Sequence, residues 1–423
     1  MSTGLAPRRA AWRLLELVGS GRPFDLALTE TFRNLSEADR RLAHELAAGT
    51  LRSAGVLDSA IAPYVRGGWE RVPNSIRNVL RLGAYQLTAL DRVPPHAAVA
   101  TTVSLAREVA GARTAAFANA VMRRVAETAP RVVPGRASHP GWLVSRWTAR
   151  YGPEEAARLQ AWNDTRPRLI VQPARWDLGQ LEAAWRQAGV EFSDAPFGAG
   201  LIPEAITRPR LLPGYEEGGF IVQEAAQALV VRYFDLPANA VVYDAAAAPG
   251  GKTIAMGRAA ALVVAADIRR DRVVRLRENL ARAGSGREHP LLADATAAPV
   301  RPVDVVVFDA PCLGTGVMAR HPEARWRVSM EGLSRLAEQA RVMLHALAQS
   351  VRPGGLLCFS TCSLEPEENE EQIEAFLRAD PRYRREPSSS VPAALLTAAG
   401  DLALVPQHHQ TDGGFAARLR RVG

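Results

Sequence analysis

The stretch NAVVYDAAAAPGGKTIAMGRAAA, residues 239–261, decides the fold class of the second half of the chain. It opens with an apolar, β-rich run that ends at Asp244, turns through two glycines and continues with helical periodicity. Similar runs follow in order, namely ALVVAADIRRDRVVRLRENLARAG, HPLLADATAAP, VDVVVFDAPCLGTG and GGLLCFSTCSLEPEENEEQIEAFLRA. This alternation of strands and helices indicates an α/β domain with a doubly wound, mostly parallel sheet. Such sheets bind ligands at the carboxyl ends of their strands, so we expect the functional residues there.

The first half of the chain has a different pattern. Residues 5–127 show helical periodicity and scarcely a strand signal, which predicts an all-α domain of six or seven helices over residues 1–130. A stretch rich in proline, glycine and small residues at 128–140 marks a linker. Residues 139–235 read as two short helices, then strands with one intervening helix, which predicts a small α+β module. The α/β domain would occupy residues 236–423.

The composition is that of a soluble globular protein, with 47% hydrophobic residues and a formal net charge of +8 over 423 residues. Arginine supplies nearly all of the basic residues, and its guanidinium pairs with phosphates and stacks on bases, which favours a nucleic-acid partner. A GC-rich genome that enriches alanine and arginine is the alternative, and composition does not separate the two. Candidate RNA-binding residues are Arg77, Arg81, Arg123, Arg124 and Arg320, and ordinary solvation of helix surfaces is the alternative for them.

The cysteines are few, at positions 312, 358 and 362. An odd, sparse set argues against a disulfide scaffold and for a reducing compartment. No second pair of cysteines or histidines stands at zinc-site spacing, so we expect no metal. No window reaches the ~18 uninterrupted apolar residues of a membrane span, and the N-terminus reads as a first helix without a cleavage signal. We expect a cytoplasmic protein that is a monomer and does not enter a membrane.

The turn after Asp244 does not match the known phosphate-binding loops. A Walker loop requires glycine where Ala246 stands, and no GxGxxG dinucleotide fingerprint is present. Gly250 and Gly251 nevertheless leave the backbone open to a small ligand, and the N-terminus of the following helix suits a carboxylate.

Acids at successive strand ends extend this site. Asp267 ends LVVAAD, where an acid accepts both hydroxyls of a ribose, and Asp294 ends LLAD, where it could meet an adenine amino group. A ribose, an adenine and a carboxylate together describe S-adenosylmethionine. Capping of the next helix is the alternative for any one of these acids. The candidate cofactor-binding residues are Asp244, Ala247, Ala248, Pro249, Gly250, Gly251, Lys252, Asp267, Arg272, Asp294, Asp309 and Pro311.

Two cysteines stand at the ends of neighbouring strands beside this site. Cys312 follows Asp309, and Cys362 ends its strand just before a helix, where exposure and the helix N-terminus favour a thiolate. Cys358 lies mid-strand and is expected to be a small buried hydrophobic residue.

A methyl donor next to two thiols suggests one chemistry. Carbon 5 of cytosine becomes an enamine-like nucleophile only after a thiolate adds to carbon 6. Asp309 is placed to hydrogen-bond ring nitrogen 3 and the exocyclic amine of that base. A base must then remove the proton from carbon 5.

The motifs DAAAAPGGKT, DAPCLGTGV, RHPEARW and STCSLEPEENE resemble, in this order, those of the RNA 5-methylcytosine methyltransferases. That family has a Rossmann-like class I methyltransferase domain that binds S-adenosylmethionine. The segments LRLGAYQLTALDRVPPHAAV and FANAVMRRV are similar to the NusB-like RNA-binding domain. The combination resembles the bacterial RsmB (Fmu/Sun) methyltransferases of 16S ribosomal RNA. The motifs GGFIVQEAAQAL and TDGGFAARLRR extend the resemblance to nearly the whole chain.

The resemblance implies a role for each catalytic candidate. The nucleophile is the cysteine of the Thr-Cys-Ser motif, Cys362, and the cysteine of the Pro-Cys motif, Cys312, assists release of the methylated RNA. Asp309 contacts the target base. Lys252 lies near that base, although a purely structural lysine is an equal alternative.

The resemblance also assigns the cofactor contacts. Asp267 holds the ribose and Asp294 the adenine, and the loop 249–252 closes over the methionine end.

Three positions depart from the family pattern. Ala246 replaces a cysteine that is not the nucleophile, so we expect it to affect packing and not activity. Glu224 replaces an aspartate, and Gly414-Phe415 replaces an aromatic pair, which leaves the local contacts open.

We therefore expect a methyltransferase for carbon 5 of a cytosine in 16S ribosomal RNA. The target base must be unstacked to reach the pocket, which favours a cytosine in a loop or a single strand. The alternatives are a transfer-RNA substrate and a non-catalytic RNA-binding assembly factor.

Overall fold

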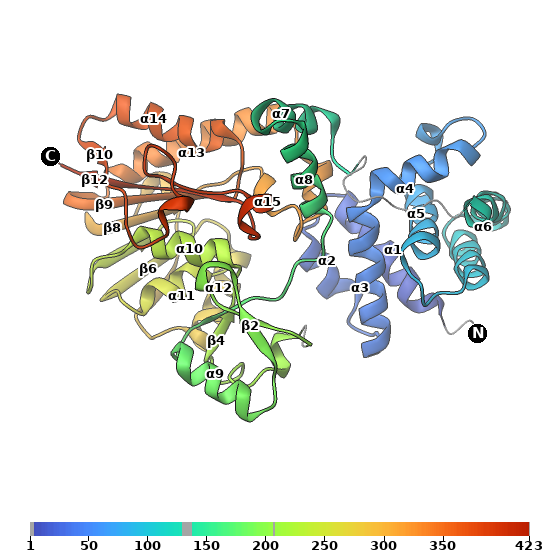
Figure 1. Cartoon of the computed structure of the whole chain (residues 1–423), viewed down its shortest axis with the longest axis horizontal. Coiled ribbons are helices and arrows are strands. Elements are labelled where there is room, and N and C mark those ends of the chain that lie inside the picture. Colours follow the sequence, from blue (N-terminus) through green and yellow to red (C-terminus); the bar gives the residue numbers. More distant parts are fainter. Residues whose placement is uncertain (1–3, 129–137, 206–207, 423) are drawn as a thin grey trace. The chain divides into compact units, whose positions relative to one another are not determined.

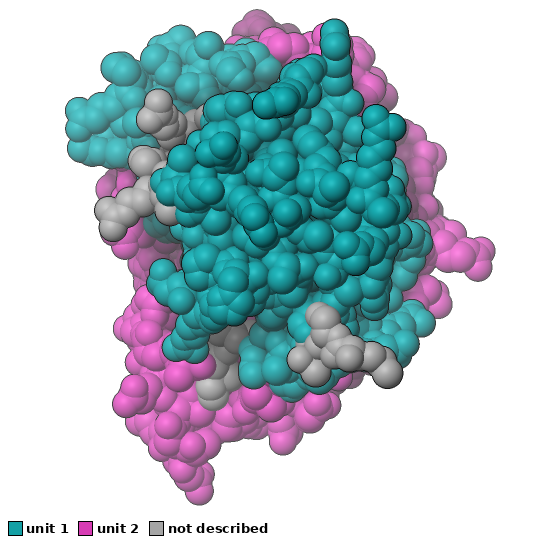
Figure 2. All heavy atoms as spheres, turned by 90° about the vertical axis from the view of Figure 1, so that its right-hand side faces the viewer, with its two compact units in different colours: residues 1–166, 318–327 teal, residues 167–317, 328–423 magenta. Residues whose placement is uncertain are grey.

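The computed structural model of the chain describes residues 4–128, 138–205 and 208–422. The chain divides into two compact units, which Figure 2 colours separately: unit 1 is residues 1–166 with 318–327, and unit 2 is residues 167–317 with 328–423. The linker expected at 128–140 falls mostly on residues 129–137, which lie outside the described residues. The three domain ranges expected from the sequence stay a prediction.

Helices form the part of unit 1 that precedes the expected linker. They are α1 (Leu5–Gly19), α2 (Phe24–Thr31), α3 (Glu37–Arg52), α4 (Ala54–Ile61), α5 (Asn74–Ala89) and α6 (Pro95–Thr128). The backbone of α6 leaves helical geometry at Ala110 and Gly111, so α6 consists of two helical segments joined by a kink. The expected six or seven helices are therefore confirmed for the described residues.

Apolar residues at helical spacing build the core of this helical part. On α5, Ile76, Val79, Leu80 and Gly83 are buried at steps of three and four residues, as an amphipathic helix requires. They pack in one cluster with residues of α1, α3 and α6. Two further helices of unit 1, α7 (Gly141–Tyr151) and α8 (Pro153–Asn163), match the two short helices expected after the linker.

The segment 318–327, which carries the whole RHPEARW motif, belongs to unit 1. Its Arg325 is fully buried and donates from Nη1 to Oδ1 of Asp164 at 2.5 Å and to the carbonyl oxygen of Arg52 at 3.0 Å. The Trp326 indole nitrogen donates to a second backbone carbonyl of α3 at 3.4 Å. A buried guanidinium is tolerated when carboxylate and carbonyl acceptors surround it. Arg325 therefore anchors this segment within unit 1.

Unit 2 begins with a small four-stranded antiparallel sheet. Its strands are β1 (Val171–Pro173), β2 (Phe192–Asp194), β3 (Leu201–Pro203) and β4 (Phe220–Val222), in the order β2-β3-β1-β4. Helix α9 (Leu178–Gln187) begins at a capping box formed by Asp177 and Gln180. Leu181 and Trp185 of α9 are buried against this sheet. The α+β character expected for this region is confirmed.

The remainder of unit 2 is built on a larger sheet. The order along the sheet is β10-β12-β9-β8-β5-β6-β7, with β11 paired to β12. The strands β5 to β9 pair in parallel, and β12 pairs antiparallel with β9. Their bounds are β5 (Val241–Asp244), β6 (Leu262–Asp267), β7 (Glu288–Leu292), β8 (Val303–Asp309), β9 (Val351–Thr361), β10 (Tyr383–Arg385), β11 (Leu402–Leu404) and β12 (Gly414–Arg421). The doubly wound, mostly parallel sheet is confirmed.

Helices cover both faces of this sheet (Figure 1). Successive residues of a strand point to opposite faces, and on β8 Val305 and Val307 pack in the cluster that includes α10, whereas Val306 and Phe308 pack with α13 and α14. Burial of both faces explains why residues 305–308 of β8 are all apolar. The helix bounds are α10 (Ala225–Phe234), α11 (Gly251–Gly257), α12 (Arg270–Ala283), α13 (Met330–Ala348), α14 (Glu370–Ala379) and α15 (Pro406–His409).

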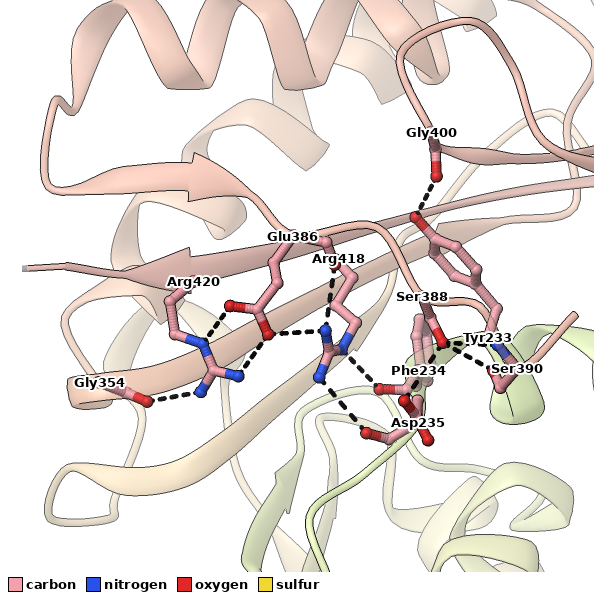
Figure 3. Close-up of polar contacts among 10 residues, drawn as sticks. All are labelled: Tyr233, Phe234, Asp235, Gly354, Glu386, Ser388, Ser390, Gly400, Arg418 and Arg420. Carbon is pink, nitrogen blue, oxygen red and sulfur yellow. Dashed lines mark hydrogen bonds and ion pairs between the residues drawn. The ribbon is translucent and has the colours of Figure 1, made fainter. Parts of the chain in front are cut away.

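A polar network secures the antiparallel end of the sheet (Figure 3). The buried Arg418 of β12 donates to the carbonyl oxygen of Phe234 at 3.0 Å and to Oε1 of Glu386 at 2.8 Å. Arg420 donates to Oε2 of the same carboxylate at 2.7 Å. The hydrogen bonds from Arg420, followed by its charge and that of Arg418, lower the pKa of Glu386 against the effect of burial. The network ties the end of α10 to β12.

Among the described residues, none of the helices combines the length and the apolar character needed to cross a bilayer.

Candidate active site

The carboxyl ends of the parallel strands bring the expected side chains to one edge of the sheet. Strands β5, β6 and β8 end at Asp244, Asp267 and Asp309, and Cys362 directly follows β9. Because β9, β8, β5 and β6 are neighbours in that order, these residues follow one another along the edge. Asp294 lies two residues beyond the end of β7, so the strand expected to end there is shorter than the sequence suggested.

Asp309 is held from both sides of its carboxylate. Lys252 Nζ donates to Oδ2 at 2.7 Å, and Ser360 Oγ donates to Oδ1 at 2.8 Å. Lys252 also donates to Oε1 of Gln227, which comes from α10. The Lys252 side chain is 12% exposed and that of Asp309 is 36% exposed, so the carboxylate can meet a ligand while its amine partner is shielded. These two hydrogen bonds fix the orientation of the Asp309 carboxylate.

Lys252 is the only lysine in the sequence. The other residues that make up the lysine and arginine total are all arginine. The two residues are not interchangeable, because lysine presents a compact ammonium and arginine a planar fork with five donors. This observation supports a role that requires an amine over the purely structural alternative.

The two strand-end cysteines come together. The Sγ atoms of Cys312 and Cys362 lie 3.5 Å apart, and both side chains are partly buried free thiols. The pKa of the Cys312 thiol is raised well above its ordinary value, first by its hydrogen bond to Cys362, then by burial and then by the charge of Cys362. Cys312 is therefore protonated when Cys362 is a thiolate.

Cys358 is fully buried on β9, as expected for a small hydrophobic residue, and burial raises the pKa of its thiol to about 12. The helix expected directly after Cys362 begins later, because a short 3-10 turn at Pro366–Glu368 precedes α14. The contribution of a helix N-terminus to a Cys362 thiolate is therefore smaller than the sequence suggested.

Backbone contacts hold the two cysteine loops together. The Gly316 N–H donates to the carbonyl oxygen of Cys362 at 3.0 Å, and the Gly413 N–H donates to the carbonyl oxygen of Gly316 at 2.7 Å. A Cβ on Gly316 would lie 2.7 Å from the backbone of Gly413, so this close approach requires glycine. The hydroxyl of Thr315 accepts from the Leu364 N–H at 2.8 Å. The loops form one rigid element.

The glycine-rich loop starts helix α11. Gly250 adopts a φ of 107°, which favours glycine, and caps α11 before Gly251. Asp244 is buried and accepts from Thr253 Oγ1 at 2.6 Å, so its carboxylate fixes the first turn of this helix. Burial raises the pKa of Asp244 to about 6 against that hydrogen bond and the charge of Lys252. The loop is positioned as expected, whereas Asp244 has an intramolecular partner.

The remaining cofactor candidates lie on the same edge. Asp267 is buried, and its Oδ1 accepts from the Arg269 N–H at 2.9 Å. Nη1 of Arg272 lies 3.9 Å from Oδ2 of Asp267. Asp294 caps the 3-10 turn after β7, and hydrogen bonds from the Thr296 backbone and hydroxyl lower its pKa. Capping and ligand binding are compatible here, because each carboxylate has two oxygens.

A buried amide oxygen without a hydrogen-bond partner among the described residues lies near the glycine-rich loop 249–252. Gln223 is 7% exposed, and among the described residues its Oε1 has no hydrogen-bond partner. Its amide nitrogen would lie 3.2 Å from a Cβ on Gly251, so the side chain lies against the loop. An unpaired buried amide oxygen beside a glycine-rich loop fits a ligand that carries an N–H or ammonium donor.

The departures from the family pattern have local explanations. Glu224 caps α10 through the Ala226 N–H at 2.6 Å and accepts from the Asp412 N–H at 3.1 Å, so the longer side chain reaches two loops. Phe415 is buried and packs edge-on against Phe359, with ring centres 6.4 Å apart. Ala246 is half-buried on the loop.

The basic candidates in unit 1 are not equally available. Arg81 donates with two nitrogens to Asp58 at 2.6 Å, and Arg77 donates to the carbonyl oxygen of Val72 at 2.8 Å. These contacts favour the structural alternative for both residues.

Arg123 is exposed on α6, and the exposed Arg124 pairs with Glu127 at 3.2 Å. Arg320 lies in the segment anchored by Arg325. RNA binding by all five stays a prediction.

Sequence reasoning missed three residues of the site: Gln227, Ser360 and Glu368. Ser360 lies on the strand face that leads to Cys362, so strand alternation could have identified it. Gln227 reaches Lys252 from α10, and no local pattern signals that contact. The Glu368 carboxylate accepts from the Leu313 N–H at 2.9 Å, although sequence reasoning assigned a role only to Cys362 in its motif.

Comparison with known proteins gives a consistent result. A family model described as 16S rRNA methyltransferase RsmB/F matches residues 232–420, and the NusB family model matches residues 5–127. The chain is 33% identical over 399 residues to the ribosomal RNA small subunit methyltransferase B of Vibrio cholerae, with 89% of each chain covered. It is 31% identical over 432 residues to the protein of the same description from Yersinia pseudotuberculosis, with 97% of each covered.

Solved structures with similar folds include the crystal structure of PH0851, with a TM-score of 0.83, 23% identity and 99% of both chains covered. The structure of NSun6 from Pyrococcus horikoshii with SFG has a TM-score of 0.61 and 20% identity, and it covers 67% of this chain and 98% of that one. These likenesses support the fold of both the helical part and the large sheet.

Proposed function

The chain belongs to the RsmB/F family of 16S rRNA methyltransferases and carries that family's combination with a NusB domain. From this premise we propose that it methylates carbon 5 of a cytosine in 16S ribosomal RNA through a covalent bond between Cys362 and carbon 6. The observation that carries the proposal is the pair of thiols 3.5 Å apart, beside an aspartate whose carboxylate is fixed by a lysine and a serine.

The residues present fit S-adenosylmethionine. Gly250 and Gly251 expose backbone at the N-terminus of α11, where a carboxylate is favoured, and Gln223 has a buried amide oxygen without a partner among the described residues. Asp267 retains an oxygen for a ribose hydroxyl, and Asp294 retains one for an amine. When bound, this cofactor supplies the methyl group. We propose the edge formed by these residues as its site.

Cys362 begins the reaction on the base. Its thiolate adds to carbon 6, and the electrons of the double bond move to carbon 5, which makes that carbon nucleophilic. Asp309 accepts a hydrogen bond from the exocyclic amine, and it accepts a second one from ring nitrogen 3 once the adduct takes up a proton from solvent there. Its carboxylate is already oriented for this by Lys252 and Ser360.

Cys312 completes the reaction. Two causes of its raised pKa, the hydrogen bond and the charge of Cys362, disappear once Cys362 is bonded to carbon 6. Cys312 then loses its proton to solvent more readily, and its thiolate accepts the proton from carbon 5. The electrons of that bond restore the ring double bond, and Cys362 leaves as a thiolate. Both cysteines must stay reduced for this sequence, which suits a cytoplasmic enzyme.

Methyl transfer from labelled S-adenosylmethionine tests this function. We expect label in unmethylated 16S ribosomal RNA, recovered as 5-methylcytidine after digestion to nucleosides, and none in unmethylated transfer RNA. Recovery of a different methylated nucleoside would refute the chemistry, and label in transfer RNA alone would refute the proposed substrate. Absence of cofactor binding by calorimetry would favour the non-catalytic assembly factor.

A further inference from the structure

Glu368 is a buried acid whose carboxylate holds the cysteine loop. It is 1% exposed, and the Leu313 N–H donates to its Oε1 at 2.9 Å and its Oε2 at 3.1 Å. Leu313 directly follows Cys312, and Glu368 lies 55 positions further along the chain, in the loop that follows Cys362. One side chain therefore connects the backbone beside each of the two thiols.

Burial at this position is energetically unfavourable for the charged form of the Glu368 carboxylate. Burial raises the pKa of Glu368 to about 7, and the charges of Glu365 and Glu367 raise it further, against hydrogen bonds from Ser363 and Leu313. Among the residues that the structure describes, Glu368 forms no ion pair with a cation. A buried carboxylate without a cationic partner destabilises a fold, and such groups cluster at functional sites.

The hydrogen bond between Glu368 and Leu313 lies next to Cys312, where a displacement of the backbone would move the Cys312 thiol away from Cys362. The Sγ atoms of Cys312 and Cys362 are 3.5 Å apart, and the Gly316 N–H already ties the far end of the Cys312 loop to the Cys362 carbonyl. Glu368 supplies the second tie, at the near end of that loop. With both ties present, the backbone that follows Cys312 is fixed at Leu313 and at Gly316.

We infer that Glu368 is a positioning residue for the release step, and that it acts by holding the backbone at Leu313 so that the Cys312 thiol stays beside Cys362. The inference rests on the proposed function. Glu368 does not touch the RNA base in this account. Its loss leaves the attack of Cys362 intact and slows the transfer of the carbon 5 proton, since a displacement of about 1 Å costs on the order of 100-fold in rate.

Three substitutions separate hydrogen bonding from charge. Glu368→Gln keeps an amide oxygen that accepts from the Leu313 N–H and removes the charge. Glu368→Asp keeps the charge on a side chain that is one methylene too short. Glu368→Ala removes both. Glu367→Ala is the matched control, because Glu367 is the adjacent acid, is half-buried and makes no hydrogen bond to Leu313.

Single-turnover and multiple-turnover methylation of 16S ribosomal RNA provide the readouts, with covalent protein–RNA complex measured on denaturing gels. We expect Glu368→Ala and Glu368→Asp to keep the first turnover, to slow later turnovers by about tenfold to 100-fold and to accumulate the complex. Glu368→Gln should stay within about threefold of wild type. If Glu368→Ala does not fold, Glu368→Asp decides the result.

Three outcomes would overturn the inference: turnover by Glu368→Asp equal to that of Glu367→Ala, equal losses in the first and later turnovers, or a Glu368→Gln variant as slow as Glu368→Asp. The Cys312→Ala variant separates this inference from the proposed function. If Cys312→Ala accumulates no complex, the proposed role of Cys312 fails. If it does and the Glu368 variants do not, only the role of Glu368 fails.

Discussion

Lys252 Nζ lies 2.7 Å from Oδ2 of Asp309, and it belongs to the only lysine in a chain with 52 lysine and arginine residues. The ammonium fits between this carboxylate and the amide oxygen of Gln227. A guanidinium is longer and planar, so it would displace one of these two partners. The site therefore depends on the shape of the cation as well as its charge.

The first prediction follows from that shape. Lys252→Arg preserves the charge and is expected to lower methyl transfer by about tenfold or more, because the Asp309 carboxylate loses its orientation. Steady-state methylation of 16S ribosomal RNA measures the effect. The control is Arg258→Lys, an exposed position next to α11, which should leave the rate unchanged. Wild-type activity in Lys252→Arg would show that charge alone suffices.

The single lysine also provides a probe of the cofactor site. Selective ¹⁵N-lysine labelling gives one lysine amide signal, from Lys252 in the glycine-rich loop. We expect S-adenosylhomocysteine to shift this signal. Asp267→Ala should weaken that binding by about tenfold to 100-fold, because a charged hydrogen-bond acceptor is lost. Asp271→Ala is the control, since Asp271 is exposed on α12 and pairs with Arg269. Equal affinity in both variants would contradict the assignment of Asp267.

Much of the fold could be predicted from the sequence. The strand ends were readable because apolar runs stopped at Asp244, Asp267 and Asp309, and parallel strands place such ends on one edge. Burial on both faces kept residues 305–308 of β8 apolar, which identified the strand although it removed the period-2 signal. For the same reason, Cys312 and Cys362 could be expected at the same edge of the sheet.

The contacts between distant segments could not be predicted. Glu368 is 55 positions from Leu313, and its acceptor role depends on how two loops fold back. Arg81 looked like a surface cation on α5, yet its partner Asp58 comes from another helix. Such contacts leave no local period, so a sequence pattern contains no trace of them.

The third prediction concerns pH. The pKa of Asp244 is raised to about 6 from an ordinary value of 3.8, chiefly by burial and in part by the charge of Asp309, while Thr253 and Lys252 oppose the shift. Between these two values the folded protein retains a proton that the unfolded chain releases. The contribution of Asp244 to stability therefore falls as pH rises through the window from about 4 to about 6.

Asp244→Asn removes this titration and keeps an oxygen that accepts from Thr253. We expect the unfolding free energy of the variant, relative to that of wild type, to increase by about 3 kcal/mol as pH rises across that window. Urea unfolding at pH 4, 5 and 7 measures the difference. A difference independent of pH would contradict the raised pKa.

The fourth prediction concerns the close backbone approach at Gly316. Gly316→Ala would place a Cβ 2.7 Å from the Gly413 backbone, so we expect a loss of about 1–3 kcal/mol in unfolding free energy together with impaired turnover. Gly179→Ala on α9 is the control, because its Cβ would meet no atom closer than 3.5 Å. That control should be neutral or stabilising by up to about 1 kcal/mol. Equal stability of the two variants would show that the loops can separate freely.

The central claim is that Cys362 forms the bond to carbon 6, and RNA containing 5-fluorocytidine tests it most directly. A fluorine at carbon 5 cannot be removed as a proton, so the wild-type enzyme should remain covalently attached after methyl transfer. Protease digestion and mass spectrometry of the complex then identify the attached residue. The account predicts a nucleotide adduct on Cys362 and no complex with Cys362→Ala. An adduct on Cys312, or an undiminished complex with Cys362→Ala, would contradict it.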